Sequence, residues 1–224
     1  MPNLNFKHNI FTEFARVGKA LSNPNRLELL EFLAQGTRNV DELAKISGLS
    51  VANTSQHLQH LRQTGLVIAQ KQGLKVYYHL SGNDVIELLT TLRNVAQRHN
   101  AEVDRLIHNV LDEKDSLEAI RRSELVERLK QGTVTVIDVR PVEEYNAGHV
   151  PGAINVPLGE LDEMLNKLPN DKEVIAYCRG PHCVLAFDAV DKLRQFGIKA
   201  RRMEDGFPEW VNAHMPVESN NYNV

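Results

Sequence analysis

The chain has two cysteines, Cys178 and Cys183, and both lie in the six-residue segment CRGPHC. Two cysteines in 224 residues are too few for a secreted scaffold held together by disulfides, and their clustering points to thiol chemistry instead. Cys178 directly follows the strand-like run VIAY, and we expect a helix to begin near Cys183. Loop N–H groups and a helix N-terminus lower the pKa of a nearby thiol, which makes Cys178 a candidate nucleophile.

The rest of the loop supplies the other candidate site residues, which are Arg179, Gly180, His182 and Cys183. Arg179 and His182 could add positive charge beside the thiol. Cys183 is a second reactive thiol if the curled loop brings the two cysteine Cα atoms within the roughly 4.4 to 6.8 Å that a disulfide permits. Alternatively, Cys183 is a small apolar residue at the start of a helix, and both thiols are buried and inert.

The segments around this loop alternate between strand-like and helix-like patterns. Strands are predicted in VTVIDV, AINV, EVIAYC and IKARRM, and helices in SELVERLKQG, GELDEMLNKL and VLAFDAVDKLRQFG. This alternation predicts an α/β fold with a parallel sheet. Functional groups in such sheets lie at the carboxyl ends of the strands, which is where Cys178 falls.

Three segments of this half, IDVRPVEEYNAGHVPGAINVPLGEL, YCRGPHC and EDGFPEW, resemble the rhodanese family of sulfurtransferases over about residues 116–218. The resemblance implies that Cys178 accepts a sulfane sulfur atom as a persulfide, stabilised by loop amides. It implies thiosulfate or polysulfide sulfurtransferase activity as one candidate function. Asp138, Arg140 and His149 are expected to tie the fold together rather than to act on a substrate.

The loop departs from the commonest pattern of that family at two positions. Cys183 stands where an Arg is often found, and Pro181 removes one N–H donor, so a doubly charged oxyanion loses a fixed cation. Efficient thiosulfate turnover is therefore in doubt, and phosphatase or arsenate reductase chemistry more so. The substitution adds a thiol: Cys183 could attack a persulfide on Cys178, giving a disulfide and sulfide, or the two could join through a polysulfide link.

The first half of the chain is organised differently. An early helix covers Phe11 to Gly18 and ends at LSNPNR, where Pro24 fits the first turn of the helix LELLEFLA. Short helices then follow in VDELAKIS, which stops at Gly48, and in NTSQHLQHLRQT, which Ser50 can cap. Two short helices joined through a glycine turn predict a helix-turn-helix.

The second of these helices has one apolar face, formed by Val51, Leu58 and Leu61, and one face that is polar but uncharged. Amides and hydroxyls suit hydrogen bonds to base edges, whereas lysines suit contacts to phosphate. The candidate DNA-binding residues are Ser50, Asn53, Ser55, Gln56, Gln59, Lys71 and Lys75. The alternative is a solvated helix face rich in Gln.

A basic β-hairpin is predicted next, with strands LVIAQ and KVYYHL and the turn KQGL. The segments LSNPNRLELLEFLA, VDELAKISGLSVANTSQHLQHLRQTGLV and KQGLKVYYHL together resemble the ArsR/SmtB family of bacterial repressors over roughly residues 8–110. The resemblance implies a homodimer, formed through the first and last helices of this domain, on an inverted-repeat operator in double-stranded DNA.

The inducer sites of that family are not reproduced here. The positions that match its cysteine metal-binding box hold Asn39 and Asp41, so no thiolate is available there. The last helix offers a loose carboxylate and histidine set without the expected spacing, formed by His99, Glu102, Asp104 and His108. We therefore expect no metal and no cofactor, and we expect the signal to enter elsewhere.

Charge and hydropathy support a soluble DNA-binding chain. Residues 1–115 carry 13 Lys and Arg against 12 Asp and Glu, and Leu43 to Asn83 contains no acidic residue, a surface that would attract phosphate. No apolar run approaches the roughly 18 residues of a membrane helix, and no segment reads as a secretion signal. A cytoplasmic protein without a membrane partner is expected.

These patterns predict two domains: a mainly α winged helix-turn-helix at residues 1–112, a linker at 113–118, and an α/β rhodanese-like domain with a parallel sheet at 119–218. The leading hypothesis is a repressor whose operator affinity changes when a small sulfur donor or an oxidant modifies Cys178. A second hypothesis is a working sulfurtransferase that uses the winged helix for dimerisation or autoregulation. Arsenical or heavy-metal binding by the two thiols is a third, although trivalent arsenic usually prefers three thiolates.

Overall fold

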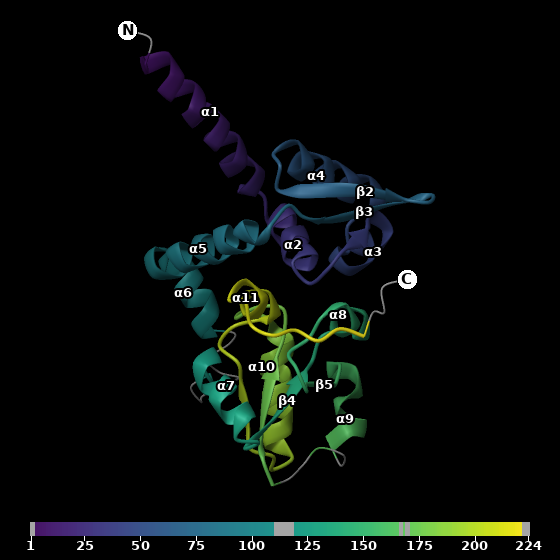
Figure 1. Cartoon of the computed structure of the whole chain (residues 1–224). Coiled ribbons are helices and arrows are strands. Elements are labelled where there is room, and N and C mark those ends of the chain that lie inside the picture. The colour runs from purple at the N-terminus through teal and green to yellow at the C-terminus, as the bar shows by residue number, and fades with distance from the viewer. Residues whose placement is uncertain (1–2, 110–118, 166–167, 169–170, 221–224) are drawn as a thin grey trace. The chain divides into compact units, whose positions relative to one another are not determined.

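The computed structural model describes residues 3–109, 119–165, 168 and 171–220 (Figure 1). Its internal contacts divide the chain into two compact units, Met1–Leu89 and Thr90–Val224. The division falls inside one continuous helix, α5 (Asn83–His99), whose first residues belong to the first unit and whose last residues belong to the second. The predicted linker, residues 113–118, lies outside the described residues.

The first unit contains the predicted helix-turn-helix and hairpin. Its elements are α1 (Asn3–Leu21), α2 (Pro24–Leu33), β1 (Arg38–Asn39), α3 (Val40–Ser47), α4 (Val51–Gln63), β2 (Val67–Gln72) and β3 (Lys75–Leu80), followed by the start of α5. The helix starts predicted at Pro24 and Ser50 are confirmed. Asn23 caps α2 with Pro24 in its first turn, and Ser50 caps α4. Gly48 ends α3 in the left-handed conformation, with φ of 70°.

The hairpin is tight and antiparallel. Gln72 pairs with Lys75, so the turn has only two central residues, and Gly73 supplies the positive φ of 61° that such a turn needs. Strand β1 was not predicted. It pairs with the other edge of β3 and completes a three-stranded sheet in the order β1-β3-β2.

The apolar face predicted for α4 is confirmed at Leu58 and Leu61, which are fully buried against α2 and α3 residues such as Leu29 and Leu43. The prediction for Val51 is wrong, since its side chain is 48% exposed. Val51 lies in the first turn of the helix, and the buried position one turn later is taken by Thr54, whose hydroxyl donates a hydrogen bond to the Ser50 carbonyl.

The second unit holds the predicted parallel sheet. Beyond the remainder of α5, its elements are α6 (Ala101–Ile107), α7 (Arg122–Lys130), β4 (Val134–Asp138), α8 (Val142–Ala147), β5 (Ile154–Asn155), η2 (Leu158–Glu160), α9 (Leu161–Met164), β6 (Glu173–Tyr177), α10 (Val184–Gln195), β7 (Ala200–Arg202) and α11 (Phe207–Asn212). The strands are all parallel, in the order β5-β4-β6-β7. The short helices α8 and α11 were not predicted.

Successive side chains of β6 enter two separate cores, as alternation along a strand requires. Val174 and Ala176 pack with residues of α9 and α10, whereas Ile175 and Tyr177 pack with residues of α7 and α11. Helices therefore cover both faces of the sheet. Cys178 continues the first of these faces, so its side chain reaches the core beneath α10.

None of the helices in the described part of the chain is long and apolar enough to span a membrane.

The contrast between Leu58 and Val51 can be measured. We expect Leu58→Ala to lower the free energy of unfolding of the first unit by about 2 to 5 kcal/mol, because it leaves a cavity in a fully buried site. Val51→Ala should change it by no more than about 0.5 kcal/mol. Urea unfolding followed by helical circular dichroism compares the two, and equal losses would contradict the assigned core.

Candidate functional site

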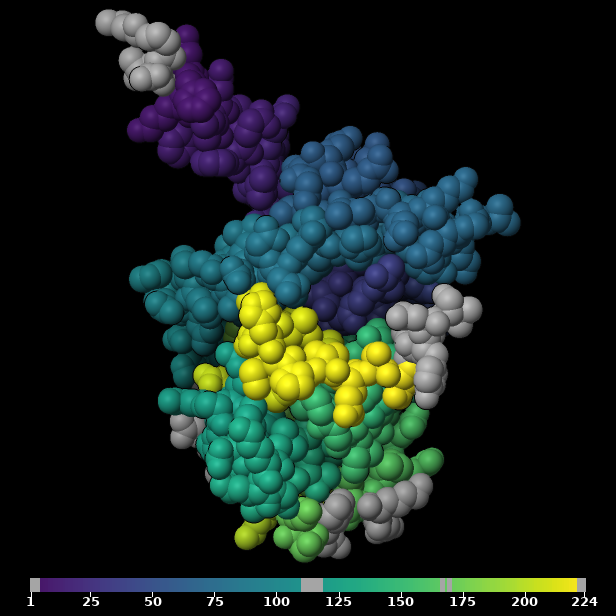
Figure 2. Space-filling view, in the orientation of Figure 1, coloured from purple at the N-terminus to yellow at the C-terminus, as the bar shows by residue number. Residues whose placement is uncertain are grey.

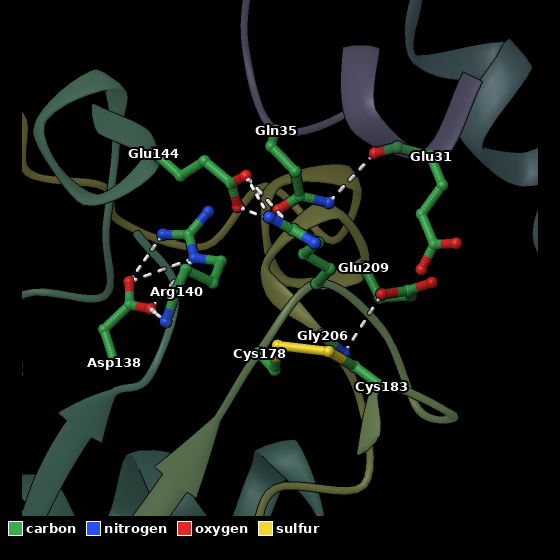
Figure 3. The surroundings of a disulfide bond; sticks show 10 residues. Glu31, Gln35, Asp138, Arg140, Glu144, Cys178, Cys183, Gly206 and Glu209 are labelled. Atoms are coloured by element: carbon green, nitrogen blue, oxygen red, sulfur yellow. Dashed lines mark hydrogen bonds and ion pairs between the residues drawn. A yellow bond between two sulfur atoms is a disulfide. The ribbon is translucent and has the colours of Figure 1, made fainter. Parts of the chain in front are cut away.

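The two cysteines lie at the carboxyl end of β6 and are joined by a disulfide (Figure 3). Cys178 follows the last residue of the strand, and Cys183 is the residue that caps the start of α10. Their Cα atoms are 6.2 Å apart. In this structure the Cys183 sulfur is bonded to Cys178, and Cys183 also packs against the core in which the Cys178 side chain is buried. The backbone turns back on itself between them, with the Cys183 N–H donating to the Gly180 carbonyl at 3.1 Å.

A second segment holds this loop from the other side. The Phe207 N–H donates to the Cys178 carbonyl at 3.0 Å. The neighbouring Gly206 lies so close to the loop that an added Cβ would stand 2.4 Å from both the Cα and the backbone nitrogen of Gly180. Only glycine fits at position 206 while the loop keeps this conformation.

Glu209 fixes the position of Gly206. Its carboxylate accepts a hydrogen bond from the Gly206 N–H at 3.0 Å, which is drawn in Figure 3, and it accepts a second from Arg93 of α5 at 2.8 Å. Arg122 donates to the Glu209 carbonyl at 3.1 Å and pairs with Asp205 at 2.9 Å. Two arginines, Arg93 and Arg122, thus bond to residues at the start of α11.

The positive charge expected from Arg179 is paired. Its guanidinium makes a two-pronged ion pair with Glu144, with distances of 2.7 to 3.1 Å, and the Glu144 carboxylate is fully buried. Burial, together with the nearby charges of Arg93 and Arg202, lowers the pKa of His182 from its ordinary value, so neutral imidazole predominates at pH 7. Neither side chain gives the loop a strong net positive charge.

A buried ion pair stands beside the site, as Figure 3 shows. Arg140 and Asp138 are both fully buried and joined by a 2.6 Å contact, and the Tyr177 hydroxyl donates to the same carboxylate at 2.6 Å. Arg140 also donates to the Gly148 carbonyl and lies over the Phe207 ring. Burial first, and then the Asp138 charge, raise the pKa of Tyr177 well above its usual range. These contacts agree with the expectation that Asp138 and Arg140 tie the fold together.

The structure exposes every residue that we assigned to DNA contact. The cap residue Ser50 is solvent-accessible, and so are four residues of α4: Asn53, Ser55, Gln56 and Gln59. Ser50 also accepts a hydrogen bond from the Asn53 N–H, so its hydroxyl is shared with the helix cap. Lys71 and Lys75 flank the turn of the hairpin, and both are exposed.

The positions where the resemblance placed metal ligands have other tasks. Asn39 caps α3, accepting hydrogen bonds from the Asp41 and Glu42 N–H groups, while Glu42 accepts one from the Asn39 N–H. On α6, Glu102 pairs with Arg105, and Asp104 lies 3.7 Å from His108. Within the described residues, no three His, Cys, Asp or Glu side chains are arranged to hold a metal ion.

Three residues that contact or support the cysteine loop were not singled out from the sequence. Gly206 and Glu209 lie in EDGFPEW, a segment that carried the resemblance but to which no role was assigned. Arg93 reaches Glu209 across 116 residues of chain, and nothing in the local sequence signals that contact.

Comparison with known proteins agrees with both halves of the fold. Residues 23–69 match the bacterial regulatory protein arsR family, and residues 121–213 match the rhodanese-like domain. The HTH-type transcriptional regulator Rv0324 of Mycobacterium tuberculosis is 44% identical over 209 residues, which is 93% of this chain and 92% of that protein. The chain belongs to the ArsR family of transcriptional regulators. It is a member that carries a rhodanese domain.

Other relatives of this ArsR-family regulator match its first half. The HTH-type transcriptional regulator YgaV of Escherichia coli is 39% identical over 79 residues, which is 34% of this chain and 79% of YgaV. A solution structure of the homodimeric winged helix-turn-helix DNA-binding domain of Mb0332 from Mycobacterium bovis is 40% identical, with a TM-score of 0.40. That likeness covers 42% of this chain and 87% of the Mb0332 fragment.

The close approach at Gly206 leads to a test in this regulator. We expect Gly206→Ala to lower the free energy of unfolding of the second unit by about 1 to 3 kcal/mol, because the new methyl group must displace the backbone of Gly180. Gly159→Ala is the matched control, since a Cβ there meets no atom within 4 Å, and it should cost less than about 0.5 kcal/mol.

Urea unfolding followed by fluorescence measures this unit alone, because Trp210 is the only tryptophan of the chain and is buried in α11. Equal stability of the two variants would show that the cysteine loop does not rest on Gly206.

Proposed function

We propose that this regulator is a repressor that binds double-stranded DNA and senses reactive sulfur or oxidants through Cys178 and Cys183. In this proposal residues 1–112 carry DNA binding and dimerisation and residues 119–218 carry sensing, and α5 extends from the first structural unit past its boundary at Leu89 into the second. The observation that carries the proposal is the cysteine pair: the only two thiols of the chain lie within bonding distance in one loop of a rhodanese-type domain.

Sensing proceeds by two thiol exchanges, with an inorganic polysulfide as the sulfur donor. The Cys178 thiolate attacks the terminal sulfur of the polysulfide, and the shortened polysulfide leaves with the electron pair. Cys183 then attacks the Sγ atom of the Cys178 persulfide, so that the disulfide forms and HS⁻ leaves with the proton of the Cys183 thiol. The two cysteines lose two electrons, and one sulfane sulfur atom gains them as sulfide.

The charges around the loop favour this chemistry over turnover of thiosulfate. A doubly charged oxyanion needs fixed cations, yet Arg179 is committed to Glu144 and His182 is neutral at pH 7. A thiol exchange needs only two sulfur atoms in line with the leaving group. The two Cα atoms, 6.2 Å apart, meet the geometric requirement for closing the bond.

The DNA-binding part of the proposal rests on exposed side chains of the first unit. The uncharged polar face of α4 suits base edges in the major groove, and the lysines of the hairpin suit phosphates. Dimerisation is supported by apolar side chains that the single chain leaves exposed on its first helix, where Phe6, Phe11 and Phe14 are each more than half accessible. Figure 2 shows the surface of this helix in purple.

The sensing step can be tested on the DNA upstream of the regulator's own gene. We expect the dithiol form and the polysulfide-treated form to differ in affinity by roughly 5- to 150-fold, the usual size of an allosteric coupling. Gel-shift titration measures the affinity, and mass spectrometry of the CRGPHC peptide measures the modification. Cys178→Ser should bind DNA and ignore polysulfide, whereas Cys183→Ser should stop at the persulfide.

Two results would reject the sensor. One is equal affinity of the two forms when Cys178 is fully modified, and the other is a normal response from Cys178→Ser. The runner-up function, an active sulfurtransferase, is favoured by the position of Cys178 directly after β6. Rapid transfer of sulfur to cyanide or to thiols, with no effect on DNA binding, would establish that function instead.

The DNA contacts are tested by substitution. Gln59→Ala should weaken binding to the operator by about 1 to 3 kcal/mol and leave non-specific binding unchanged, because a base contact carries sequence information. Lys71→Ala should weaken binding to every sequence and reduce the salt dependence. Gln131→Ala removes an exposed glutamine of the second unit and should change neither. Fluorescence anisotropy on operator and scrambled duplexes separates these outcomes.

A further inference from the structure

The path by which the cysteine loop could influence the rest of the chain begins at its backbone. Because Gly206 has no room beside Gly180, any movement of the loop toward α11 must displace the backbone of residue 206. The Phe207 N–H is bonded to the Cys178 carbonyl itself, so residues 206 and 207 contact the first half of the loop, from Cys178 to Gly180. The state of the cysteines is therefore coupled directly to the start of α11.

Glu209 extends this path out of the loop. One of its carboxylate oxygens holds the Gly206 N–H, and the other accepts from Arg93 of α5. The pair is largely shielded from solvent, with 9% of the Glu209 side chain and 24% of the Arg93 side chain exposed. A shielded, charge-assisted hydrogen bond is sensitive to displacement of either partner.

The loop has space in which to change. A cavity of about 400 Å³ is lined by Pro181 and His182 of the loop, by Arg93 and Gln97 of α5, and by Glu209. The loop residues Pro181 and His182 thus border open space. The same cavity thus borders the loop, the Glu209 carboxylate that is bonded to the Gly206 N–H, and the helix α5 that carries Arg93.

We propose that Glu209 and Arg93 form a relay by which the bonding state of Cys178 and Cys183 is passed to α5. This inference rests on the proposed sensing function and names how that site is coupled to the rest of the protein. In the disulfide form the loop packs closely against Gly206, and Arg93 is held by its ion pair with Glu209. When the disulfide is reduced, or when Cys178 carries an added sulfur atom, residue 206 shifts and the hold on Arg93 loosens. Glu209 and Arg93 act as positioning residues and touch no sulfur.

Helix α5 is a suitable receiver because it is continuous from Asn83 to His99, and its first residues pack in the core of the first unit. Val85, for example, belongs to the same core as Leu58 and Leu61 of α4. A change in the order or position of the Arg93 end of this continuous helix therefore passes along its backbone toward Val85, which lies in the same core as α4.

Hydrogen–deuterium exchange of peptides from residues 90–99 tests the relay without any DNA. The full-length protein is compared as the disulfide and after reduction by a phosphine, which supplies two electrons to the disulfide and is itself oxidised to the phosphine oxide, with water as the source of the oxygen and the thiol protons. In the wild type we expect amide protection in α5 to fall on reduction by roughly fivefold or more. In Arg93→Gln and in Glu209→Gln this difference between the two forms should disappear, while the disulfide still forms.

Two variants serve as controls. Arg128→Gln breaks an ion pair of the same kind elsewhere in the unit, since Arg128 is also 24% exposed and bonds a shielded carboxylate, that of Glu173. Arg128→Gln should show the same change in α5 amide protection on reduction as the wild type. Arg93→Lys preserves the charge and should show part of that change. Fluorescence of Trp210 confirms that each variant is folded.

The outcomes separate the relay from the sensor. The relay is overturned if Arg93→Gln retains the full difference in exchange, if Arg128→Gln loses it equally, or if the wild type shows none. If DNA affinity still responds to polysulfide in those cases, the sensor stands without this relay. If exchange in α5 responds as expected but DNA affinity does not, the relay stands and the proposed function fails.

Discussion

The contact between Gly206 and the backbone of Gly180 is the constraint on which the site depends. A hydrogen atom at residue 206 allows two backbone segments to touch, and no side-chain packing could bring them as close. This contact places the Phe207 N–H on the Cys178 carbonyl and the start of α11 against the loop. The loop is therefore held by main-chain atoms on one side and by the disulfide on the other, and the ion pair of Arg179 with the buried Glu144 adds a side-chain contact.

Buried charges make the surrounding framework rigid. Arg140 and Asp138 are removed from water, and each is satisfied by several partners, including Tyr177 and the Gly148 carbonyl. Removing one member of such a pair leaves an uncompensated buried charge, at a cost of about 3 to 5 kcal/mol, so these residues resist change. The Arg93 and Glu209 pair is different, because Arg93 is 24% exposed and the buried Glu209 carboxylate has a second donor in the Gly206 N–H. The Arg140 and Asp138 pair is therefore fixed, whereas the Arg93 and Glu209 pair that connects the loop to α5 can change.

The sequence predicted the parts of this structure that depend on local patterns. Apolar runs such as EVIAY identified the strands, and turn residues such as Gly48 and Pro24 marked the helix ends. Helices α8 and α11 have six residues each, too few for a helical period to show. Ion pairs between residues far apart in the sequence were the larger part of what the sequence did not predict. Arg179 was read as a free positive charge because Glu144, which lies 35 residues away, could not be assigned to it. The candidate nucleophile was visible in sequence, but its electrostatic surroundings were not.

The small size of the cysteine loop suits a reversible switch. Chain-entropy arguments give a disulfide that closes about six residues a stabilisation of about 2 kcal/mol, less than the roughly 3 kcal/mol for a loop of 15. Closing or opening this bond therefore changes the stability of the unit only modestly. The change is nevertheless similar to the 1 to 3 kcal/mol that allosteric coupling requires. A structural disulfide that spanned a long segment would be too costly to open in each cycle. A bond across one loop changes the contacts of Gly206 while the two cores on either side of β6 remain intact.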